Sequence, residues 1–308
     1  MNNNTIWLYW EDRPGIPTPP HILLCREVLK YQCRSCEIRL VTPQNLHFYL
    51  PDIDDRIWEI SLRNKQQNPI AVRCAFIRAF LLERYGGLYV DSDCIALRDY
   101  TDIFSYLHNF DFIGIRRTSA KTKHISIGFY ASKQSGTVIS EYAEQLRKIL
   151  KEKTVFSWGE VGAHLLTPIV NSHLDKVLLF RENQIHPIVA EQQHEFCNNS
   201  LNLKDVISQD AYCFMLFHRI FEQQVSGKTL RSASVWDLYF SDKLISRVFR
   251  LVYPQNEFTK TFGYSSNGQE TLFNSFNFSH QKLLSIAQKI QSSSKKLSRL
   301  KNEIQKMY

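Results

Sequence analysis

The stretch Leu81-Leu-Glu-Arg-Tyr-Gly-Gly-Leu-Tyr-Val-Asp-Ser-Asp93 sets a hydrophobic segment directly against two carboxylates that a single serine separates. Gly86 suits the left-handed position just past a helix, so we expect the helix that begins near Asn68-Pro69 to end at about Tyr85. Leu88 to Val90 then predict a short buried strand that delivers both carboxylates at its end. This order of helix, glycine, strand and carboxylates indicates a site at the edge of a sheet.

The regions around this stretch alternate between strand and helix patterns. Strands are expected over residues 5–10, 37–41, 110–115, 126–131, 177–180 and 213–217. Helices are expected over residues 21–31, 43–50, 54–65, 136–153, 159–172 and 236–252. The alternation predicts an α/β fold with a mostly parallel central sheet, in which ligands bind at the carboxyl ends of the strands.

The 308-residue chain has the composition of a folded protein, with 44% hydrophobic and 22% charged residues. Its formal net charge of +8 favours an anionic partner, and charge alone leaves nucleotides, polyanionic glycans, nucleic acid and acidic lipid surfaces open. The first residues lack the pattern of a signal peptide, and no apolar run reaches membrane-spanning length. We therefore expect a cytoplasmic protein, either soluble or peripheral on the inner face of the membrane.

The seven cysteines form no closely spaced disulfide framework, which agrees with a reducing compartment. Cys33 and Cys36 form a CxxC pair, but no second CxxC or HxxxH follows to complete a structural zinc site. Two interpretations of this pair stay open, a chance spacing at the surface and a role in metal or redox chemistry.

The chain divides by composition into three parts. Residues 1–255 are expected to form the α/β domain, and residues 256–279, rich in Asn, Ser and Gly interleaved with Phe, a linker or flap. Residues 280–308 carry apolar side chains at helical spacing among many lysines, which predicts a basic amphipathic helix. Such a helix either packs against another helix or lies on an anionic membrane surface.

Asp91 and Asp93 indicate a site for a divalent cation. Residues two apart on an extended segment point to the same side, so both carboxylates can reach one ion while Ser92 faces away. Mn²⁺ and Mg²⁺ prefer oxygen ligands and are often held by one or two carboxylates together with substrate phosphates. A nucleotide diphosphate would supply these phosphates, and the ion would stabilise its charge as a sugar leaves. For the tripeptide alone, two exposed aspartates in a turn are the alternative.

The longer stretch Arg78-Ala-Phe-Leu-Leu-Glu-Arg-Tyr-Gly-Gly-Leu-Tyr-Val-Asp-Ser-Asp93 resembles the signature of family 32 glycosyltransferases, especially bacterial capsular polysaccharide synthesis proteins. Ile6-Trp-Leu-Tyr-Trp10 and Phe156-Ser-Trp-Gly-Glu-Val-Gly162 resemble further motifs of that family. The resemblance implies a GT-A-type nucleotide-sugar-binding fold and metal-dependent transfer with retention of configuration. The implied donor is a UDP-linked hexose or N-acetylhexosamine, and the implied acceptor is a capsular or other surface polysaccharide or its lipid-linked precursor.

The resemblance also implies roles for single residues. Asp93 would be the direct metal ligand, and Asp91 would contact the ribose or the sugar and assist the metal. Arg78 would face the donor sugar, and Tyr89 matches the aromatic residue before the aspartate pair. His218 would lie near the diphosphate and complete the metal shell or donate to a phosphate, the alternative being ordinary hydrogen bonds at a strand end.

Three further residues have two interpretations each. Glu160 either faces the acceptor hydroxyl or the reacting face of the sugar, or it stabilises the start of a helix through the helix dipole. Tyr9 and Trp10 either stack on the uracil or sugar ring of the donor or belong to the core. For Trp7, at the start of the same strand, the core is the favoured place.

One position departs from the pattern of the family. Three residues before Arg78 the family usually has an aspartate that holds hydroxyls of the donor sugar, and this chain has Ala75. The departure keeps a second function open, a non-catalytic scaffold that binds glycan or nucleotide in a polysaccharide assembly complex. The Gly-Gly-x-Tyr before the aspartates argues against a phosphatase, and the lack of a recognised motif argues against a nucleic-acid partner.

Overall fold

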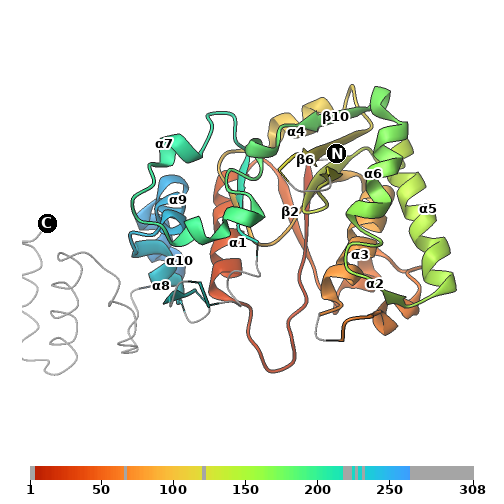
Figure 1. Ribbon diagram of the computed structural model, residues 1–308, viewed down its shortest axis with the longest axis horizontal. Coiled ribbons are helices and arrows are strands. Elements are labelled where there is room, and N and C mark those ends of the chain that lie inside the picture. The colour runs from red at the N-terminus through yellow and green to blue at the C-terminus, as the bar shows by residue number, and fades with distance from the viewer. Residues whose placement is uncertain are drawn as a thin grey trace, which may run out of the picture. The chain divides into compact units, whose positions relative to one another are not determined.

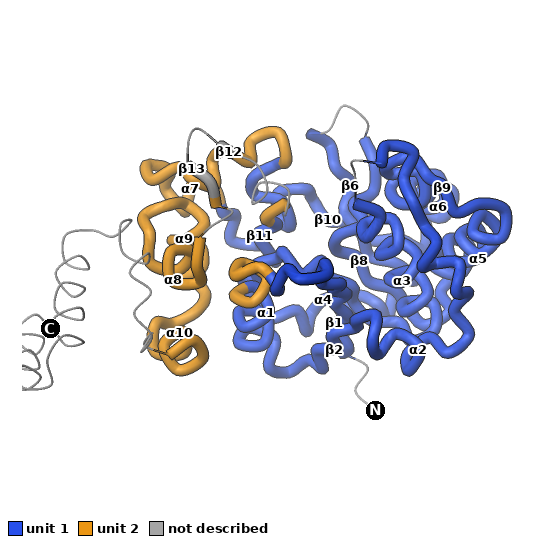
Figure 2. Tube along the Cα trace, turned by 90° about the horizontal axis from the view of Figure 1, so that it is seen from below, with its two compact units in different colours: residues 1–18, 25–189, 207–215 blue, residues 19–24, 190–206, 216–308 orange. Residues whose placement is uncertain are grey.

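The structure, a computed structural model, describes residues 4–65, 68–119, 123–217, 224–225, 228–230 and 233–263. The chain forms two compact units, one of residues 1–18, 25–189 and 207–215 and one of residues 19–24, 190–206 and 216–308 (Figure 2). His218 and the helix expected over 280–308 lie outside the described residues. The other expected site residues belong to the first unit.

The first unit is built on a seven-stranded sheet (Figure 1). Its strands are β1 (Thr5–Tyr9), β2 (Glu37–Val41), β4 (Gly87–Val90), β6 (Phe112–Arg117), β7 (His124–Ile125), β8 (Phe129–Ser132) and β10 (Val177–Phe180). The order is β10-β6-β8-β4-β1-β2, and β7 pairs with β6. The pairs β1·β2, β1·β4 and β6·β10 are parallel, whereas β8 is antiparallel to β4 and β6. Strands β10, β6, β4, β1 and β2 thus run in one direction, which confirms the predicted α/β fold with a mostly parallel sheet.

The reversed direction of β8 follows from the short chain between it and β6. Residues 118–128 separate the two strands, and they include the two-residue strand β7. A parallel crossover needs a dozen or more residues and usually a helix, so the chain returns antiparallel. Because Val90 pairs with Phe129, this return sets the residues just before β8 beside the end of β4.

Most helices lie where the sequence predicts them. They are α1 (Pro20–Gln32), α2 (Leu46–Tyr49), α3 (Ile70–Tyr85), α4 (Thr101–Tyr106), α5 (Thr137–Glu152), α6 (Ala163–Ser172), α7 (Leu203–Val206), α8 (Val235–Phe240), α9 (Leu244–Val252) and α10 (Gln255–Phe262). The short strands outside the large sheet pair as β3 (Ser61–Leu62) with β9 (Val155–Phe156), β5 (Cys94–Ala96) with β11 (Cys213–Met215), and β12 (Gln224–Val225) with β13 (Lys228–Thr229). None of the helices in the described ranges is both long and apolar enough to cross a membrane.

Three predicted segments differ from the structure. The helix expected over 54–65 is a 3₁₀ turn at Asp55–Glu59 followed by β3. The helix expected over 236–252 is divided into α8 and α9, because the Arg250 guanidinium donates to the carbonyl oxygens of Tyr239 and Ser241 at 2.5 and 2.8 Å and so completes the end of α8. Helix α10 occupies the first part of the range 256–279, for which a linker or flap is expected.

Helix α3 and strand β4 meet at a corner that requires two glycines. Gly86 and Gly87 have φ angles of 68° and 103°, in the left-handed region that favours glycine. A Cβ at Gly86 would stand 2.6 Å from the backbone nitrogen of Gln134, and one at Gly87 would stand 2.5 Å from the carbonyl oxygen of Thr5. The indole of Trp7 donates to the Gly86 carbonyl oxygen at 2.9 Å. The predicted helix end at Gly86 is confirmed, and the corner fixes the direction of β4.

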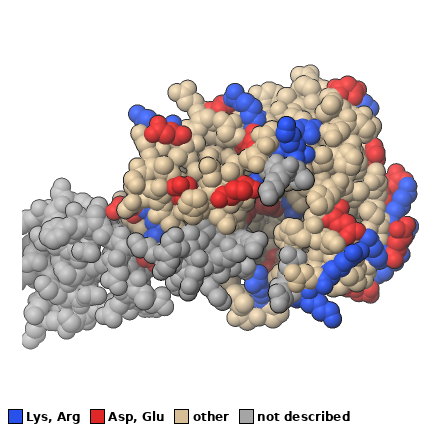
Figure 3. All heavy atoms as spheres, in the orientation of Figure 1, with Lys and Arg blue, Asp and Glu red and all other residues tan. Residues whose placement is uncertain are grey.

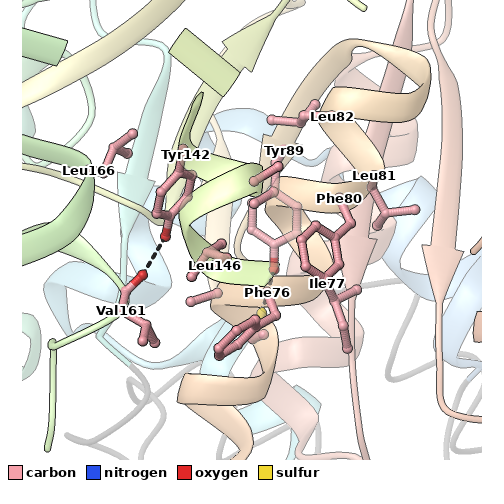
Figure 4. Close-up of a cluster of buried hydrophobic side chains, with 14 of the residues drawn as sticks. Phe76, Ile77, Phe80, Leu81, Leu82, Tyr89, Tyr142, Leu146, Val161 and Leu166 are labelled. Atoms are coloured by element: carbon pink, nitrogen blue, oxygen red, sulfur yellow. Dashed lines mark hydrogen bonds between the residues drawn. The ribbon is translucent and has the colours of Figure 1, made fainter. Parts of the chain in front are cut away.

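A hydrophobic core holds α3 against the sheet and against α5 (Figure 4). The buried side chains labelled in this view are Phe76, Ile77, Phe80, Leu81 and Leu82 of α3, Tyr89 of β4, Tyr142 and Leu146 of α5, Val161 of the turn before α6, and Leu166 of α6. Full burial of such a side chain contributes about 1.5–3 kcal/mol relative to exposure. The core therefore makes α3 a rigid support for the polar side chains that it carries.

Charged side chains of both signs lie next to one another on the face shown in Figure 3. On α5, Arg147 pairs with Glu83 of α3, and Lys148 pairs with Glu144 at 2.7 Å. Two basic side chains of this helix thus pair with acidic ones, although the chain as a whole carries a net charge of +8.

Candidate active site

The carboxyl ends of β1 and β4 form a topological switch point. Strand β1 pairs in parallel with β2 on one side and with β4 on the other. Ligands of α/β sheets bind in the crevice outside the carboxyl ends of strands at such a point. Asp91 directly follows β4, so the strand places its carboxylate at this edge.

Asp91 is held on one side and partly exposed on another. Its backbone N–H donates to the Gly128 carbonyl oxygen at 2.7 Å, and its side chain is 33% exposed. A Cβ at Gly128 would stand 2.6 Å from Oδ2 of Asp91. Glycine therefore lets the segment before β8 approach the carboxylate. Sequence reasoning missed Gly128, because it lies inside the strand predicted over 126–131, whereas β8 begins only at Phe129.

Arg78 reaches Asp91 from α3 and is almost fully buried, with a side chain that is 4% exposed. Its Nη1 donates to Oδ1 of Asp91 at 3.1 Å and to the Ile127 carbonyl oxygen, and its Nε donates to the Cys74 carbonyl oxygen at 3.1 Å. Burial lowers the pKa of the guanidinium, but the nearby Asp91 carboxylate raises it, and the net pKa is well above the usual value. Arg78 therefore keeps its charge and fixes the orientation of Asp91.

Tyr89 and Ala75 lie in the core around this arginine. Tyr89 is fully buried, its ring lies 4.7 Å from the guanidinium carbon of Arg78, and its hydroxyl lies 3.0 Å from Sγ of Cys74. Burial raises the pKa of the Tyr89 hydroxyl well above its usual value. Because Tyr89 has no exposed surface, its ring packs against Arg78 within the core. Ala75 is buried on the same helix, in a position where a carboxylate would be surrounded by apolar side chains.

Ser92 and Asp93 form a turn instead of the expected extended segment. The chain turns there because β5 leaves the large sheet and pairs antiparallel with β11. Ser92 is buried and donates to the Tyr9 carbonyl oxygen at 3.2 Å, so it faces the interior. Asp93 is half-buried. The pKa of the Cys25 thiol is raised mainly because Cys25 is buried, and the negative charge of Asp93 is the next largest cause.

The two aspartates suit a metal ion that is shared with a ligand. The described ranges contain no group of three or more His, Cys, Asp or Glu side chains that could enclose a metal ion. Asp91 and Asp93 offer the carboxylate oxygens that Mn²⁺ and Mg²⁺ prefer, and sites with one or two carboxylates depend on substrate phosphates for further ligands. The chemistry of these donors therefore fits a metal held together with a diphosphate.

A second polar cluster, which the sequence did not reveal, lies after β1. Glu11 accepts from Nε and Nη2 of Arg73 at 3.0 and 2.7 Å, and from the hydroxyl of Tyr9 at 2.9 Å. The side chains of Arg73 and Glu11 are 9% and 16% exposed. Burial and the Glu11 carboxylate raise the pKa of the Tyr9 hydroxyl far above its usual value. No local signal marks this pair, because the two residues are far apart in the chain.

Of the aromatic residues of β1 and its loop, only Trp10 offers much surface. Trp7 and Tyr9 are buried, in agreement with their core interpretation. Trp10 is half-buried, donates from its indole nitrogen to Oδ1 of Asp12 at 2.6 Å, and has the Arg26 guanidinium 5.4 Å from its ring centre. Trp10 is therefore the residue of this set that is able to stack on a ligand.

Glu160 lies in a turn ahead of α6 and not in the first turn of a helix as expected. The residues before Ala163 leave the helical conformation, with a φ of 78° at Gly159. The Glu160 carboxylate accepts from the Ser157 backbone N–H at 2.8 Å and from Lys153. Burial raises the pKa of Glu160, but the bonds from Lys153 and from the Ser157 backbone together with nearby positive charge outweigh it, and the net pKa is lowered. Its contacts are those of a carboxylate that closes a turn.

The cysteines are all free thiols, and Cys33 donates to the Arg98 carbonyl oxygen at 3.8 Å. Burial raises the pKa of Cys36, which is half-buried, and that of Cys33 lies far above its usual value for the same reason. Both thiols are thus protonated at neutral pH, which does not favour the metal or redox interpretation of the CxxC pair.

Comparison with known proteins places the chain in a family. The family model described as "Capsular polysaccharide synthesis protein" matches residues 1–202, and no curated protein matches the chain. Among solved structures, the glycosyltransferase GlyE of Streptococcus pneumoniae TIGR4 aligns over 86% of this chain and 66% of its own, with 17% identity and a TM-score of 0.44.

Two further solved structures are similarly distant. The galactosyltransferase LgtC, in complex with donor and acceptor sugar analogues, aligns over 83% of this chain and 99% of its own, with 9% identity and a TM-score of 0.43. The PaToxG glycosyltransferase aligns over 56% of this chain and 69% of its own, with 13% identity and a TM-score of 0.42. The match of the family model to more than half of the residues confirms the resemblance to capsular polysaccharide synthesis proteins. The chain belongs to the capsular polysaccharide synthesis protein family.

Proposed function

We propose that the protein is a glycosyltransferase of GT-A type that moves a sugar from a nucleotide sugar to a capsular or other surface polysaccharide or its lipid-linked precursor. The observation that carries the proposal is the Arg78–Asp91 pair at the carboxyl end of β4, where a buried cation orients a partly exposed carboxylate. Family membership supports the same activity. A UDP-linked hexose or N-acetylhexosamine is the proposed donor.

The proposed donor site extends from the end of β1 to the end of β4. Asp91 would bind a hydroxyl of the ribose or the sugar, and Asp93 with Asp91 would hold Mn²⁺ or Mg²⁺ against the diphosphate. The role of His218, which lies outside the described residues, stays a prediction. When bound, the ion supplies Lewis-acid stabilisation of the charge on the leaving diphosphate. Trp10 would stack on the uracil, and Tyr9 would hold the loop that carries it through its bond to Glu11.

Arg78 acts mainly as a positioning residue in this proposal. Three of its five N–H donors go to Asp91 and to the carbonyl oxygens of Cys74 and Ile127, and its side chain is only 4% exposed, so we assign it to orienting Asp91. Retention of configuration would then come from attack on the same face of the sugar that the diphosphate leaves, with the diphosphate oxygen accepting the proton of the acceptor hydroxyl. For Glu160, which the turn already uses, a role beside the acceptor stays a prediction.

The buried position of Ala75 favours one alternative function. With no carboxylate at this position, fewer groups hold the donor sugar, and a non-catalytic scaffold that binds nucleotide or glycan would have the same fold. Attachment of the segment 280–308 to an anionic membrane surface, and a cytoplasmic location, stay predictions.

Hydrolysis of nucleotide sugars by the full chain tests the proposal. We would measure release of UDP, GDP, CMP and ADP from their sugars with and without Mn²⁺, and thermal unfolding with the same ligands, because a ligand at 100 times its Kd stabilises by about 2.7 kcal/mol. We expect turnover of one donor that requires metal and is lost in Asp93→Ala. Stabilisation by a donor without any turnover would favour the scaffold, and no response to any donor would contradict both functions.

A further inference from the structure

Trp158 is a large aromatic side chain that the fold leaves in solvent. Trp158 is 57% exposed, whereas most tryptophans of folded proteins are largely buried. It lies in the turn of residues 157–162 between β9 and α6. An exposed indole on a defined turn offers a flat apolar surface to a ligand.

The turn that presents Trp158 is fixed at both ends. At its start, Glu160 accepts from the backbone N–H of Ser157 at 2.8 Å and from Lys153. At its end, the hydroxyl of Tyr142 donates to the Val161 carbonyl oxygen at 2.7 Å (Figure 4). The exposure of Trp158 therefore belongs to a turn with defined geometry.

The same turn rests on the segment that holds the proposed catalytic carboxylate. A Cβ at Gly162 would stand 2.7 Å from Cδ1 of Ile127, so the turn backbone packs directly on that side chain. The Ile127 carbonyl oxygen accepts from Arg78, and the next residue, Gly128, accepts from the backbone of Asp91. One layer of residues thus separates the turn of Trp158 from the Arg78–Asp91 pair.

The strand order decides on which side of Asp91 this turn lies. Strand β4 has β1 on one side and β8 on the other, and the proposed nucleotide site lies toward β1. Ile127 precedes β8, so Gly162, the end of the turn that packs on Ile127, lies on the β8 side of β4, and the proposed nucleotide site lies on the β1 side. A group that receives the sugar must approach the reacting carbon from a side that the nucleotide leaves open.

We propose that Trp158 is a stacking platform for a pyranose ring of the acceptor saccharide. The inference rests on the proposed glycosyltransferase function and assigns its acceptor subsite. The C–H face of a pyranose is apolar and flat enough to cover an indole, while its hydroxyls need polar neighbours. Glu160 of the same turn and Lys153, which follows α5 and pairs with Glu160, have side chains that are 30% and 39% exposed and supply polar groups there.

Binding of simple disaccharides to the full chain tests the platform directly. We would record saturation-transfer NMR with chitobiose, lactose, cellobiose and maltose on the unmodified chain, Trp158→Phe and Trp158→Ala. Removal of the indole takes away the stacking surface, so we expect about a tenfold loss of affinity in Trp158→Ala and a smaller loss in Trp158→Phe, which keeps an aromatic ring. Phe48→Ala is the matched control, because Phe48 is an aromatic residue that is 80% exposed on α2.

A kinetic readout separates this inference from the proposed function. With a disaccharide that accepts sugar, the KM for the acceptor should rise about tenfold in Trp158→Ala relative to the KM for the donor, and Phe48→Ala should change neither. Equal disaccharide affinity of Trp158→Ala and the unmodified chain, or no binding of any disaccharide, overturns the platform. A chain that binds disaccharides through Trp158 but turns over no donor contradicts the glycosyltransferase and leaves the saccharide site standing. Loss of self-association in Trp158→Ala without loss of disaccharide binding assigns the indole to a protein contact and also overturns the platform.

Discussion

Helix α3 carries two arginines that each pair with an acidic residue at the end of a strand, and the two pairs differ in their carboxylates. Arg73 gives Glu11 two bonds, and Tyr9 adds a third, so that both carboxylate oxygens are engaged. Arg78 gives Asp91 one bond at 3.1 Å and directs its other contacts to backbone carbonyl oxygens. The Glu11 side chain is 16% exposed, and that of Asp91 is 33% exposed.

The difference shows that the carboxylate, and not the arginine, decides whether each pair is able to bind a ligand. Both arginines are buried, so the capacity to meet a ligand depends on the carboxylate. A carboxylate with saturated oxygens stabilises a loop, whereas one that keeps exposed surface beside a buried cation is able to bind a substrate group. We therefore assign Arg73–Glu11 to structure and Arg78–Asp91 to the proposed reaction.

Loss of the Arg73–Glu11 ion pair should have the largest effect on the free energy of unfolding. In Arg73→Met the Glu11 carboxylate stays buried without its cation, so we expect the free energy of unfolding to fall by about 3–5 kcal/mol. Denaturant unfolding followed by circular dichroism measures it. The double variant Arg73→Met with Glu11→Leu should recover part of the loss, because it leaves no unpaired charge. A loss below about 1 kcal/mol in the single variant would contradict the structural role of the pair.

Neutralising the other carboxylate should act on turnover more than on stability. In Asp91→Asn we expect the rate of donor turnover to fall about 100- to 1000-fold, as for loss of a key electrostatic group. The loss of unfolding free energy should be smaller than in Arg73→Met, because the amide oxygen still accepts from Arg78. Asp52→Asn is the matched control, since Asp52 also pairs with an arginine, Arg84, but is 75% exposed. Equal turnover in Asp91→Asn and the unmodified chain would remove the distinction between the pairs.

A third acidic residue, Glu182, extends the comparison to the pH dependence of stability. It accepts from the backbone N–H groups of Thr118 and Ser119 at 2.7 and 2.8 Å and from Arg117 at 3.3 Å. Burial raises the pKa of this carboxyl, but the bonds from Ser119 and Thr118 lower it to about 2. Like Glu11, it is saturated by the chain, and we expect it to stabilise the fold.

The direction of the pH effect follows from proton binding. Between the unfolded pKa of 4.5 and the folded pKa of about 2, the unfolded chain binds more protons, so the stability from Glu182 is complete above pH 4.5 and is lost as the pH falls toward 2. We expect this loss to be roughly 2 kcal/mol in denaturant unfolding at a series of pH values. Glu182→Gln should show a flatter profile over the same range. Identical slopes for the two chains would exclude Glu182 as the origin.

Local patterns in the sequence were sufficient for the corner at Gly86 and the strand that ends at Asp91. Both depend on neighbours along the chain, the glycine after a helix and the apolar run after the glycine. The direction of β8 was not predicted in the same way, because it depends on the length of the connection from β6. The division of α8 from α9 depends on Arg250, which lies beyond the break.

The candidate site shows the same limit. Arg78 and Asp91 were found together because one motif contains both, and the structure brings them into contact. Gly128, Glu11 and Arg73 were missed because their partners come from distant parts of the chain. The extended geometry assumed for Asp91 and Asp93 was wrong, since the pairing of β5 with β11 turns the chain between them, and that pairing has no local signal.

The bonds of Glu11 have a practical consequence for modifying the molecule. They fix the base of the loop after β1, whereas the residues at 12–17 are exposed and a Cβ at Gly15 would meet no atom within 4 Å. Exposed loop tips with a fixed base tolerate insertions and attached groups. An affinity tag or a fluorescent dye introduced at position 15 should therefore leave β1 in its place in the sheet.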